Sequence, residues 1–201
     1  MRLFVAVCLP AEIRERLASV QDRLRRARAD VSWVKPANLH VTVKFLGETE
    51  PKLLPRIRPV LADAARKATA FAVTLAGVGT FGGRIPRVVW VGIREGAERL
   101  APLAVAVEEG LAGVGFPKEK RGFAGHFTLG RVRSPNNVEA LLAALRDEPT
   151  APLGTVPVDR FILMQSELHP SGSVYSEIEA YPLGEPEREE RGKETRCESP
   201  S

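Results

Sequence analysis

The chain has 201 residues, of which 44% are hydrophobic and 27% are charged, so it is long enough to bury a hydrophobic core without disulfides or metals. It contains only two cysteines, Cys8 and Cys197, which excludes a disulfide scaffold and a cysteine-rich zinc site. The net charge of +4 is a mild basic excess that selects no class of partner by itself. Three histidines are present, His40, His126 and His169, and any chemistry that needs an imidazole must use them.

The apolar run at the start of the chain, residues 3–8, is too short for a signal peptide and far too short to span a bilayer. No stretch of 18 apolar residues occurs elsewhere in the sequence. One cysteine lies in this apolar run and the other in a polar segment, which fits a reducing compartment. We therefore expect a cytoplasmic protein that does not contact a membrane.

The last part of the chain, residues 184–201, differs in composition from the rest. It contains no aliphatic or aromatic side chain and cannot bury enough surface to offset the entropy of ordering. Its six Glu against four Lys or Arg give it a net charge of −2, which leaves +6 on residues 1–183. We expect a folded, basic domain over residues 1–183 and a disordered polar tail over residues 184–201.

Hydrophobic periodicity predicts strands and helices that alternate along the folded part. In chain order these are a strand over 2–7, a helix over 10–29, a loop or edge segment over 31–38, a strand over 40–46, a helix over 50–68, a strand over 71–76, a glycine-rich connection over 77–86, a strand over 87–93, a helix over 97–112, a loop, a strand over 126–132, a helix over 136–145, a long strand region over 156–168, and a last strand over 174–181 after a hairpin turn. Several connections are too short for parallel crossovers. The pattern indicates an α+β protein of two pseudo-symmetric lobes, each an antiparallel sheet flanked by helices.

Two segments of the sequence repeat the same pattern 86 residues apart, His-Val-Thr at 40–42 and His-Phe-Thr at 126–128. Because residues i and i+2 of a strand point to the same face, each strand presents an imidazole beside a hydroxyl. If an approximate two-fold relates the lobes, His40, Thr42, His126 and Thr128 converge on one small ligand.

This set of groups fits the cleavage of a phosphodiester. One imidazole takes a proton from the attacking hydroxyl while the other gives a proton to the leaving oxygen, and both titrate near neutral pH. Thr hydroxyls donate hydrogen bonds to the phosphoryl oxygens. The basic residues Lys44 and Arg131 follow the two motifs and add positive charge.

Chance and metal binding explain the two motifs less well than phosphodiester cleavage does. A single His-x-Thr in a strand arises often by chance, and a buried, hydrogen-bonded histidine is enough to account for it; two copies that use two of three histidines are harder to dismiss. A zinc site needs three or four ligands, and no carboxylate or cysteine lies at a useful spacing from either motif. The sequence contains neither a nucleophile elbow nor a P-loop.

The paired motifs resemble the signatures of the two-histidine phosphoesterase superfamily. In their longer forms, HVTVKFLG preceded by WVKPANL, and HFTLGRV, they resemble the RNA 2',3'-cyclic phosphodiesterase family, also called 2'-5' RNA ligases. The segments RLFVAVCLP, PRVVWVGI and SELHPSGSVYSEI are similar to that family as well. The resemblance covers residues 1 to about 183.

The resemblance implies a bilobal fold around a central groove and hydrolysis of an RNA or nucleoside 2',3'-cyclic phosphate to a 2'-phosphate, without a metal or any cofactor. It implies that His40 is the proton donor, that His126 is the proton acceptor that activates water, and that Thr42 and Thr128 hold the phosphoryl oxygens. It also implies a reverse activity, 2'-5' RNA ligation, in which a phosphodiester is formed. Partners would be RNA or nucleotides with 2',3'-cyclic phosphate ends, and we expect a monomer.

Three neighbours of the motifs are further candidates for substrate binding. Phe45 and Arg131 each follow a histidine by five positions, so strict alternation places them on the opposite face from the histidines. Phe45 then packs in the core, unless a bulge turns its ring outward to stack on a base. Burial of Arg131 is costly, which favours contact with phosphate or base. Alternation places Lys44 on the face of the first motif, although an exposed lysine at a strand edge is an equal alternative.

Weaker candidates come from outside the motifs. His169 has no Thr partner and lies in a turn, so we expect a surface position. Trp90 is expected in the core, and Trp33 in a loop is open to either role. Ser166 and Tyr175 match family positions near the groove and are candidates to orient the second histidine.

Two other functions fit the same sequence. A protein that keeps the groove but turns nothing over would be an RNA-binding module, which the basic domain favours. A phosphoesterase of the same superfamily with another substrate would act on a different cyclic phosphate.

Overall fold

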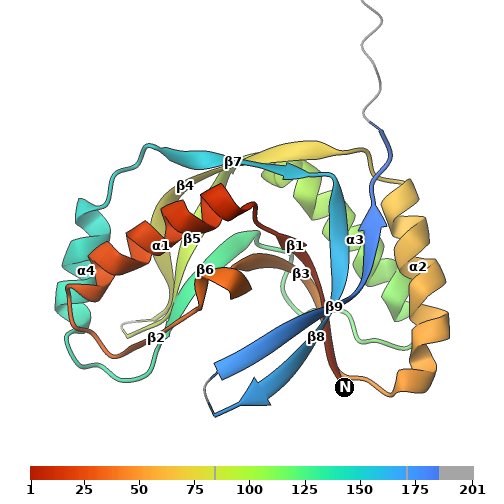
Figure 1. Ribbon diagram of the computed structural model, residues 1–201, viewed down its shortest axis with the longest axis horizontal. Coiled ribbons are helices and arrows are strands. Elements are labelled where there is room, and N and C mark those ends of the chain that lie inside the picture. The colour runs from red at the N-terminus through yellow and green to blue at the C-terminus, as the bar shows by residue number, and fades with distance from the viewer. Residues whose placement is uncertain (84, 171, 186–201) are drawn as a thin grey trace, which may run out of the picture.

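In the computed structural model, which describes residues 1–83, 85–170 and 172–185, nine strands pair into one curled antiparallel sheet with helices packed against it (Figure 1). The strands are β1 (Arg2–Cys8), β2 (Val31–Trp33), β3 (His40–Glu48), β4 (Phe71–Gly82), β5 (Pro86–Glu95), β6 (His126–Val132), β7 (Pro152–Val158), β8 (Arg160–His169) and β9 (Gly172–Pro182). The helices are α1 (Ala11–Arg25), α2 (Leu54–Arg66), α3 (Ala97–Ala112) and α4 (Val138–Asp147), with short 3-10 turns at Pro36–Asn38 and Pro51–Leu53.

The sheet consists of two halves that meet at β3 and β6. Its order is β7-β4-β5-β6-β3-β1-β8-β9, and β2 pairs with β6 outside this path. Between β3 and β6 one residue pair, Val41 with Phe127, makes the ladder. The expected α+β fold with two lobes and antiparallel strands is therefore confirmed, and the two lobes share one continuous sheet.

The helices cover the sheet in two pairs, with α1 beside α4 on one lobe and α2 beside α3 on the other (Figure 1). Their apolar stripes face the strands, as in α1, where Ile13, Leu17, Val20 and Leu24 are buried. Alternate residues of the strands complete this core. In β1, Leu3, Val5 and Val7 join it, whereas Phe4 lies on the opposite face against His40. We call this opposite face of the sheet, which carries both His-x-Thr motifs, the motif face.

Several expected elements have other boundaries. Residues 77–82, expected as part of a connection because of their glycines, continue β4, and residues 78–82 pair with β5. The segment over 31–38 begins with the short strand β2. The long strand region after residue 150 is two strands, β7 and β8, separated at Asp159, which pair with different lobes. Single-sequence patterns define these partners poorly, because the pairing is non-local.

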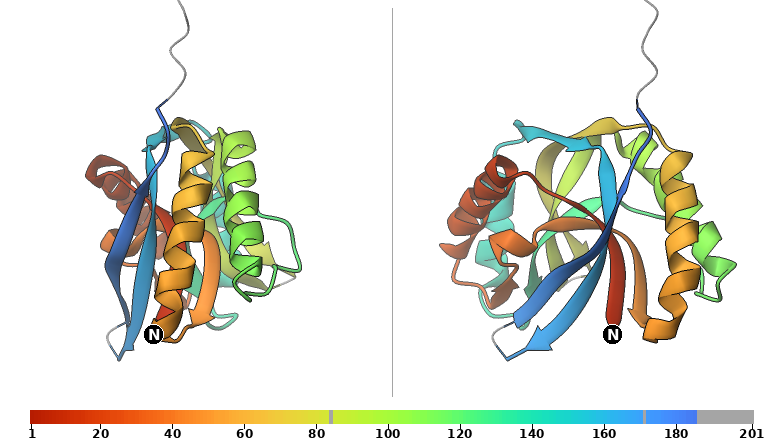
Figure 2. Two further views of the ribbon diagram at one scale, coloured as in Figure 1. Left: turned by 90° about the vertical axis from the view of Figure 1, so that its right-hand side faces the viewer. Right: turned by 45° about the vertical axis from the view of Figure 1, so that its right-hand side comes forward.

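Strands β8 and β9 form a long hairpin, which projects beyond the rest of the fold at the end of β8 and the start of β9 (Figures 1 and 2). The expected hairpin is confirmed by the pairing of β8 with β9, which extends to His169 and Gly172. After β9, Gly184 still bonds the main chain of Ala68 and Ala70 in a parallel bridge. The rest of the expected tail, residues 186–201, lies outside the described residues. No helix among the described residues is long and apolar enough to cross a membrane.

Candidate active site

The two motifs lie side by side on neighbouring antiparallel strands, and each histidine begins its strand. Val41 and Phe127 pair across the strands, and both are buried in the core. Their sequence neighbours therefore lie together on the motif face, where the register, extended by one residue, sets His40 opposite Thr128 and Thr42 opposite His126. The structure thus brings together all four groups that the sequence pattern selects.

Both imidazoles are oriented by the same backbone contact. Nδ1 of His40 lies 2.7 Å from the carbonyl oxygen of Asn38, and Nδ1 of His126 lies 2.7 Å from that of Ala124. Because a carbonyl oxygen only accepts, each Nδ1 carries the proton that it donates, which leaves Nε2 available for chemistry. Nε2 of His40 lies 3.0 Å from Oγ1 of Thr42, so in the neutral imidazole it accepts the hydroxyl proton.

The surroundings of the two histidines differ. His40 packs against the rings of Phe4 and Tyr175, with centroids 4.9 and 5.4 Å away. Burial lowers the pKa of His40, the hydrogen bond to Asn38 opposes this shift, and the like charge of His126 adds to it. His126 makes an edge contact at 4.8 Å with Phe81, which is 40% exposed. His40 therefore favours its neutral form more than an exposed imidazole does.

Each motif strand has a β-bulge at the same position, and the bulge changes which of the following residues lie on the motif face. In the pairing of β3 with β1, Thr42 and Lys44 face consecutive residues of β1, so Val43 is the extra residue. In the pairing of β6 with β5, Leu129 is the extra residue in the same way. The two motif strands consequently share one burial pattern over their first six positions. Each bulge turns the fifth residue after the histidine back to the motif face.

Phe45 and Arg131 therefore reach the motif face, which strict alternation argued against. Phe45 is 55% exposed, and its ring centroid lies 6.3 Å from that of Phe4, which contacts His40. Arg131 is exposed on β6. The expectation of a core position for Phe45 is wrong, and the bulge alternative describes its placement.

The placement expected for Lys44 is also wrong. The bulge turns its side chain into the interior, where the residue is 3% exposed. Its Nζ donates to Oε1 of Glu108 and to the carbonyl oxygen of Pro117, each at 2.8 Å. Lys44 therefore does not lie beside His40 and Thr42 as a substrate contact.

Two aromatic residues of β4 and β5 lie where the sequence did not predict them: Trp90 was expected elsewhere, and Phe81 was not a candidate. Trp90, expected in the core, is half-buried and pairs with Thr128 on the motif face. Phe81, within the expected glycine-rich connection, packs against Trp90 at 5.1 Å and against His126. Gly79 makes room for the indole, because a Cβ there would lie 2.5 Å from it. The alternation of glycine with larger residues in 77–81 is the signal that marks a strand here.

The remaining candidates lie around the edges of the motif face or away from it. Tyr175, a candidate to orient the second histidine, contacts His40. His169 is exposed near the hairpin tip, beside Glu167. Trp33 belongs to β2, and Arg25 lies over its ring. Two surface cavities, of about 210 and 440 Å³, lie elsewhere, between α2 and α3.

Comparison with known proteins identifies the family. Two antiparallel strands that each present His-x-Thr on one face of a curled sheet define a two-histidine phosphoesterase. The sequence model of the 2'-5' RNA ligase superfamily matches residues 7–170, so the chain belongs to that superfamily. It is 34% identical over 184 residues to the RNA 2',3'-cyclic phosphodiesterase of Methanothermobacter thermautotrophicus, covering 91% of this chain and 99% of the relative. The protein of that name from Thermus thermophilus is 37% identical over 202 residues, covering 96% and 94%.

Solved structures give the same result. The crystal structure of TT0787 of Thermus thermophilus superposes with a TM-score of 0.75 at 31% identity and covers 92% of this chain and 99% of that one. The structure of E. coli LigT complexed with 3'-AMP superposes with a TM-score of 0.73 at 29% identity and covers 90% and 97%.

Proposed function

We propose that this protein hydrolyses the 2',3'-cyclic phosphate end of RNA or of a nucleotide and leaves a 2'-phosphate. The observation that carries the proposal is the matched pair of imidazoles on the motif face, each with Nδ1 bonded to a carbonyl oxygen and Nε2 on the far side of the ring from it, where that of His40 meets Oγ1 of Thr42. The names of the relatives support this substrate, and the basic charge of residues 1–183 suits a phosphodiester.

In the proposed mechanism, Nε2 of His126 accepts a proton from water as the water oxygen attacks phosphorus. The bond from phosphorus to the 3' oxygen breaks, and Nε2–H of His40 gives its proton to that oxygen. Thr42 and Thr128 donate hydrogen bonds to the non-bridging oxygens, and the charge of Arg131 offsets the charge that develops there. Phe45 offers a ring on which the base stacks. With an RNA 5'-hydroxyl in place of water as the nucleophile, the same steps form a 2'-5' linkage with the same histidine roles. Run backward, they cleave that linkage with the 5'-hydroxyl as the leaving group, and the two histidines exchange roles.

The lowered pKa of His40 places a condition on this mechanism. A proton donor must be charged before the reaction, whereas burial favours the neutral imidazole in the free protein. The anionic phosphate of the substrate supplies the opposite charge that returns the proton to His40. The acid role of His40 is therefore coupled to substrate binding.

The test is hydrolysis of a panel of 2',3'-cyclic nucleotides and short cyclic-phosphate RNAs, with the position of the product phosphate determined by phosphorus NMR. We expect 2'-phosphate products, and we expect H40A and H126A each to lower kcat by roughly 100- to 10,000-fold. H169A is the matched control, because His169 is exposed on the hairpin and distant in sequence from both motifs. EDTA should change nothing.

Full activity in both H40A and H126A would overturn the proposal. Salt-sensitive RNA binding without any product would support the RNA-binding module instead. A product only from a cyclic phosphate of another class, added to the panel for comparison, would keep the chemistry and change the substrate. The cytoplasmic location and the monomeric state stay predictions from the sequence.

A further inference from the structure

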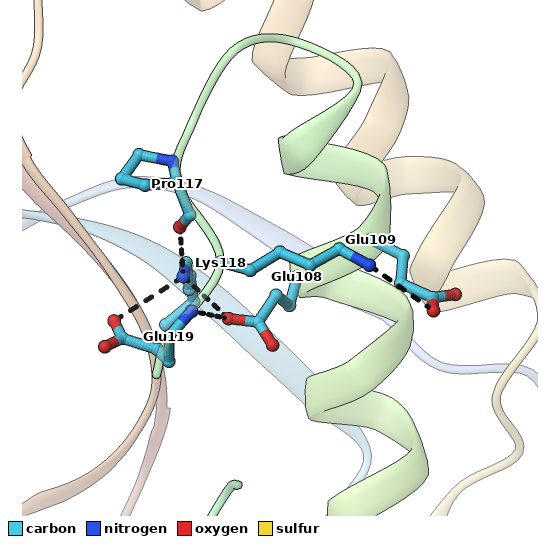
Figure 3. A network of polar contacts seen from close by, with 6 residues as sticks. Glu108, Glu109, Pro117, Lys118 and Glu119 are labelled. Carbon is cyan, nitrogen blue, oxygen red and sulfur yellow. Dashed lines mark hydrogen bonds and ion pairs between the residues drawn. The ribbon is translucent and has the colours of Figure 1, made fainter. Parts of the chain in front are cut away.

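Lys44 is a buried charge that the proposed mechanism does not use. Besides Glu108 and Pro117, its Nζ has Glu119 as a partner, with Oε1 at 3.5 Å. These three partners are labelled in Figure 3. A buried lysine is costly unless it is paired and hydrogen-bonded, and these partners meet both needs. The amine thus joins three separate parts of the fold, which are β3, α3 and the segment after α3.

The segment that Lys44 binds leads directly into His126. Residues 113–125 connect α3 to β6, and they end at Ala124, whose carbonyl oxygen orients the imidazole, and Gly125. Glu119 is held a second time, because its backbone N–H donates to Oε1 of Glu108 at 2.6 Å. This bond and the bond from Lys44 lower the pKa of Glu108, so its carboxylate is charged where it accepts both.

The segment is exposed over residues 117–122 and at Ala124, and it is closely packed at its last residue before the histidine. A Cβ on Gly125 would lie 3.0 Å from Ile93, 3.2 Å from Phe123 and 3.3 Å from Leu100. Close packing of this kind transmits displacements, because the interior has few voids to absorb them. Lys44 thus holds one end of the stretch that contains Ala124, and the packing of Gly125 holds the other.

The first histidine has a corresponding arrangement on the other motif strand. Gln21, which is buried, donates from Nε2 to the carbonyl oxygens of Val34 and Leu129, each at 2.8 Å. Val34 also donates its backbone N–H to Leu129 at 2.8 Å. Val34 belongs to the segment that leads into His40, and Leu129 is the bulge residue of β6. Each motif strand thus anchors, at its bulge, the segment that leads into the other histidine.

We propose that Lys44 is a positioning residue for His126, which it orients through Pro117, Glu119 and the carbonyl oxygen of Ala124. The kinetic part of this inference rests on the proposed function, whereas the orientation of the imidazole does not. The inference rests on the bulge in β3. The bulge turns Lys44 from the motif face into the interior, where the Lys44 amine binds the segment before the second motif.

The test is the variant K44M, examined by nitrogen-15 NMR of the histidine rings and by kinetics on a 2',3'-cyclic nucleotide. We expect the His126 resonances to move from the Nδ1–H tautomer toward a mixture of tautomers, while those of His40 stay in place. We expect kcat to fall roughly 10- to 100-fold with little change in KM, because a misplaced base is felt in the transition state. K118M is the matched control, since Lys118 lies in the same segment but is exposed. It should change neither measurement.

Two further variants keep the inference testable. K44M/E108Q removes both charges and leaves an oxygen to accept from Glu119, so we expect it to fold even where K44M alone is too unstable. We expect it to regain stability but not kcat or the native His126 spectrum. Q21M should give the reverse spectral result, with His40 shifted and His126 unchanged.

The inference is overturned if K44M/E108Q restores both kcat and the His126 spectrum, because Lys44 then only compensates the charge of Glu108. Unchanged His126 resonances in K44M overturn it too. A wild-type protein that turns over no cyclic phosphate refutes the proposed function alone, because the ring resonances still report the orientation of His126.

Discussion

Val41 and Phe127 form the residue pair through which the two lobes of the sheet join between β3 and β6. Each lies between the His and the Thr of its motif, and each turns its side chain into the core. A local two-fold axis through this pair relates His40 to His126 and Thr42 to Thr128. The separation of the two imidazoles is therefore set by the packing of two apolar side chains on the other side of the sheet.

We predict that F127A loses activity as well as stability. Phe127 is fully buried, and truncation of a buried Phe to Ala costs about 3–5 kcal/mol. F161A is the control, because Phe161 is equally buried but lies in β8. Denaturant unfolding should show similar losses for both. Only F127A should lower kcat in the folded fraction. A native kcat in F127A would show that the packing of Phe127 does not set the geometry of the active site.

A second prediction concerns the protonation of His40. Since burial is the main cause of its lowered pKa, His40 should titrate below the ordinary value of about 6.5 in the free protein. The unfolded chain then binds more protons at pH values just below 6.5, so the contribution of His40 to stability is present above that pH and is lost as pH falls. An NMR titration measures this pKa directly.

The same titration has two controls. H126A should raise the pKa of His40 only in part, because the like charge is removed and the burial stays. A bound nucleoside 2'-monophosphate should raise it further through its negative charge. A pKa of His40 at or above 6.5 in the free protein would contradict the burial argument.

The third prediction is that G79A disturbs the aromatic side of the site. The added Cβ would lie 2.5 Å from the Trp90 ring, which must move and take Phe81 with it. Overpacking of this kind costs about 1–3 kcal/mol. Indole fluorescence in a W33F background should shift, and kcat should fall because Phe81 contacts His126. G83A, where an added Cβ meets nothing within 4 Å, should behave as the wild type.

The sequence was sufficient to predict the two lobes, most of the elements and the four central side chains, because these depend on local periodicity and on a repeated motif. Face assignments after the motifs failed at Lys44 and Phe45 for one physical reason. Alternation is a property of one strand, whereas a bulge depends on the partner strand, and β1 and β5 impose it at Val43 and Leu129. Non-local packing also explains Gly79, whose role is visible only once Trp90 lies above it.

Arg131 gives a fourth prediction. Its exposed charge on the motif face should contribute to phosphate binding, so R131M should raise KM more than it lowers kcat and should weaken the salt dependence of kcat/KM. R133M is the control, because Arg133 lies two residues further along the chain and donates to Ser32 instead. Equal effects of the two variants would mean that only net charge matters.

The last prediction separates base stacking from phosphate chemistry at Phe45. The ring is exposed on the motif face beside Phe4, and stacking of a base on an aromatic side chain is worth about 1–3 kcal/mol. F45A should therefore raise KM for a 2',3'-cyclic nucleotide by roughly 10-fold, which corresponds to about 1.4 kcal/mol. Ribose 2',3'-cyclic phosphate has no base, so F45A and the wild type should hydrolyse it with the same kinetics. If F45A slows both substrates equally, Phe45 supports the position of His40 through Phe4 and does not stack on the base.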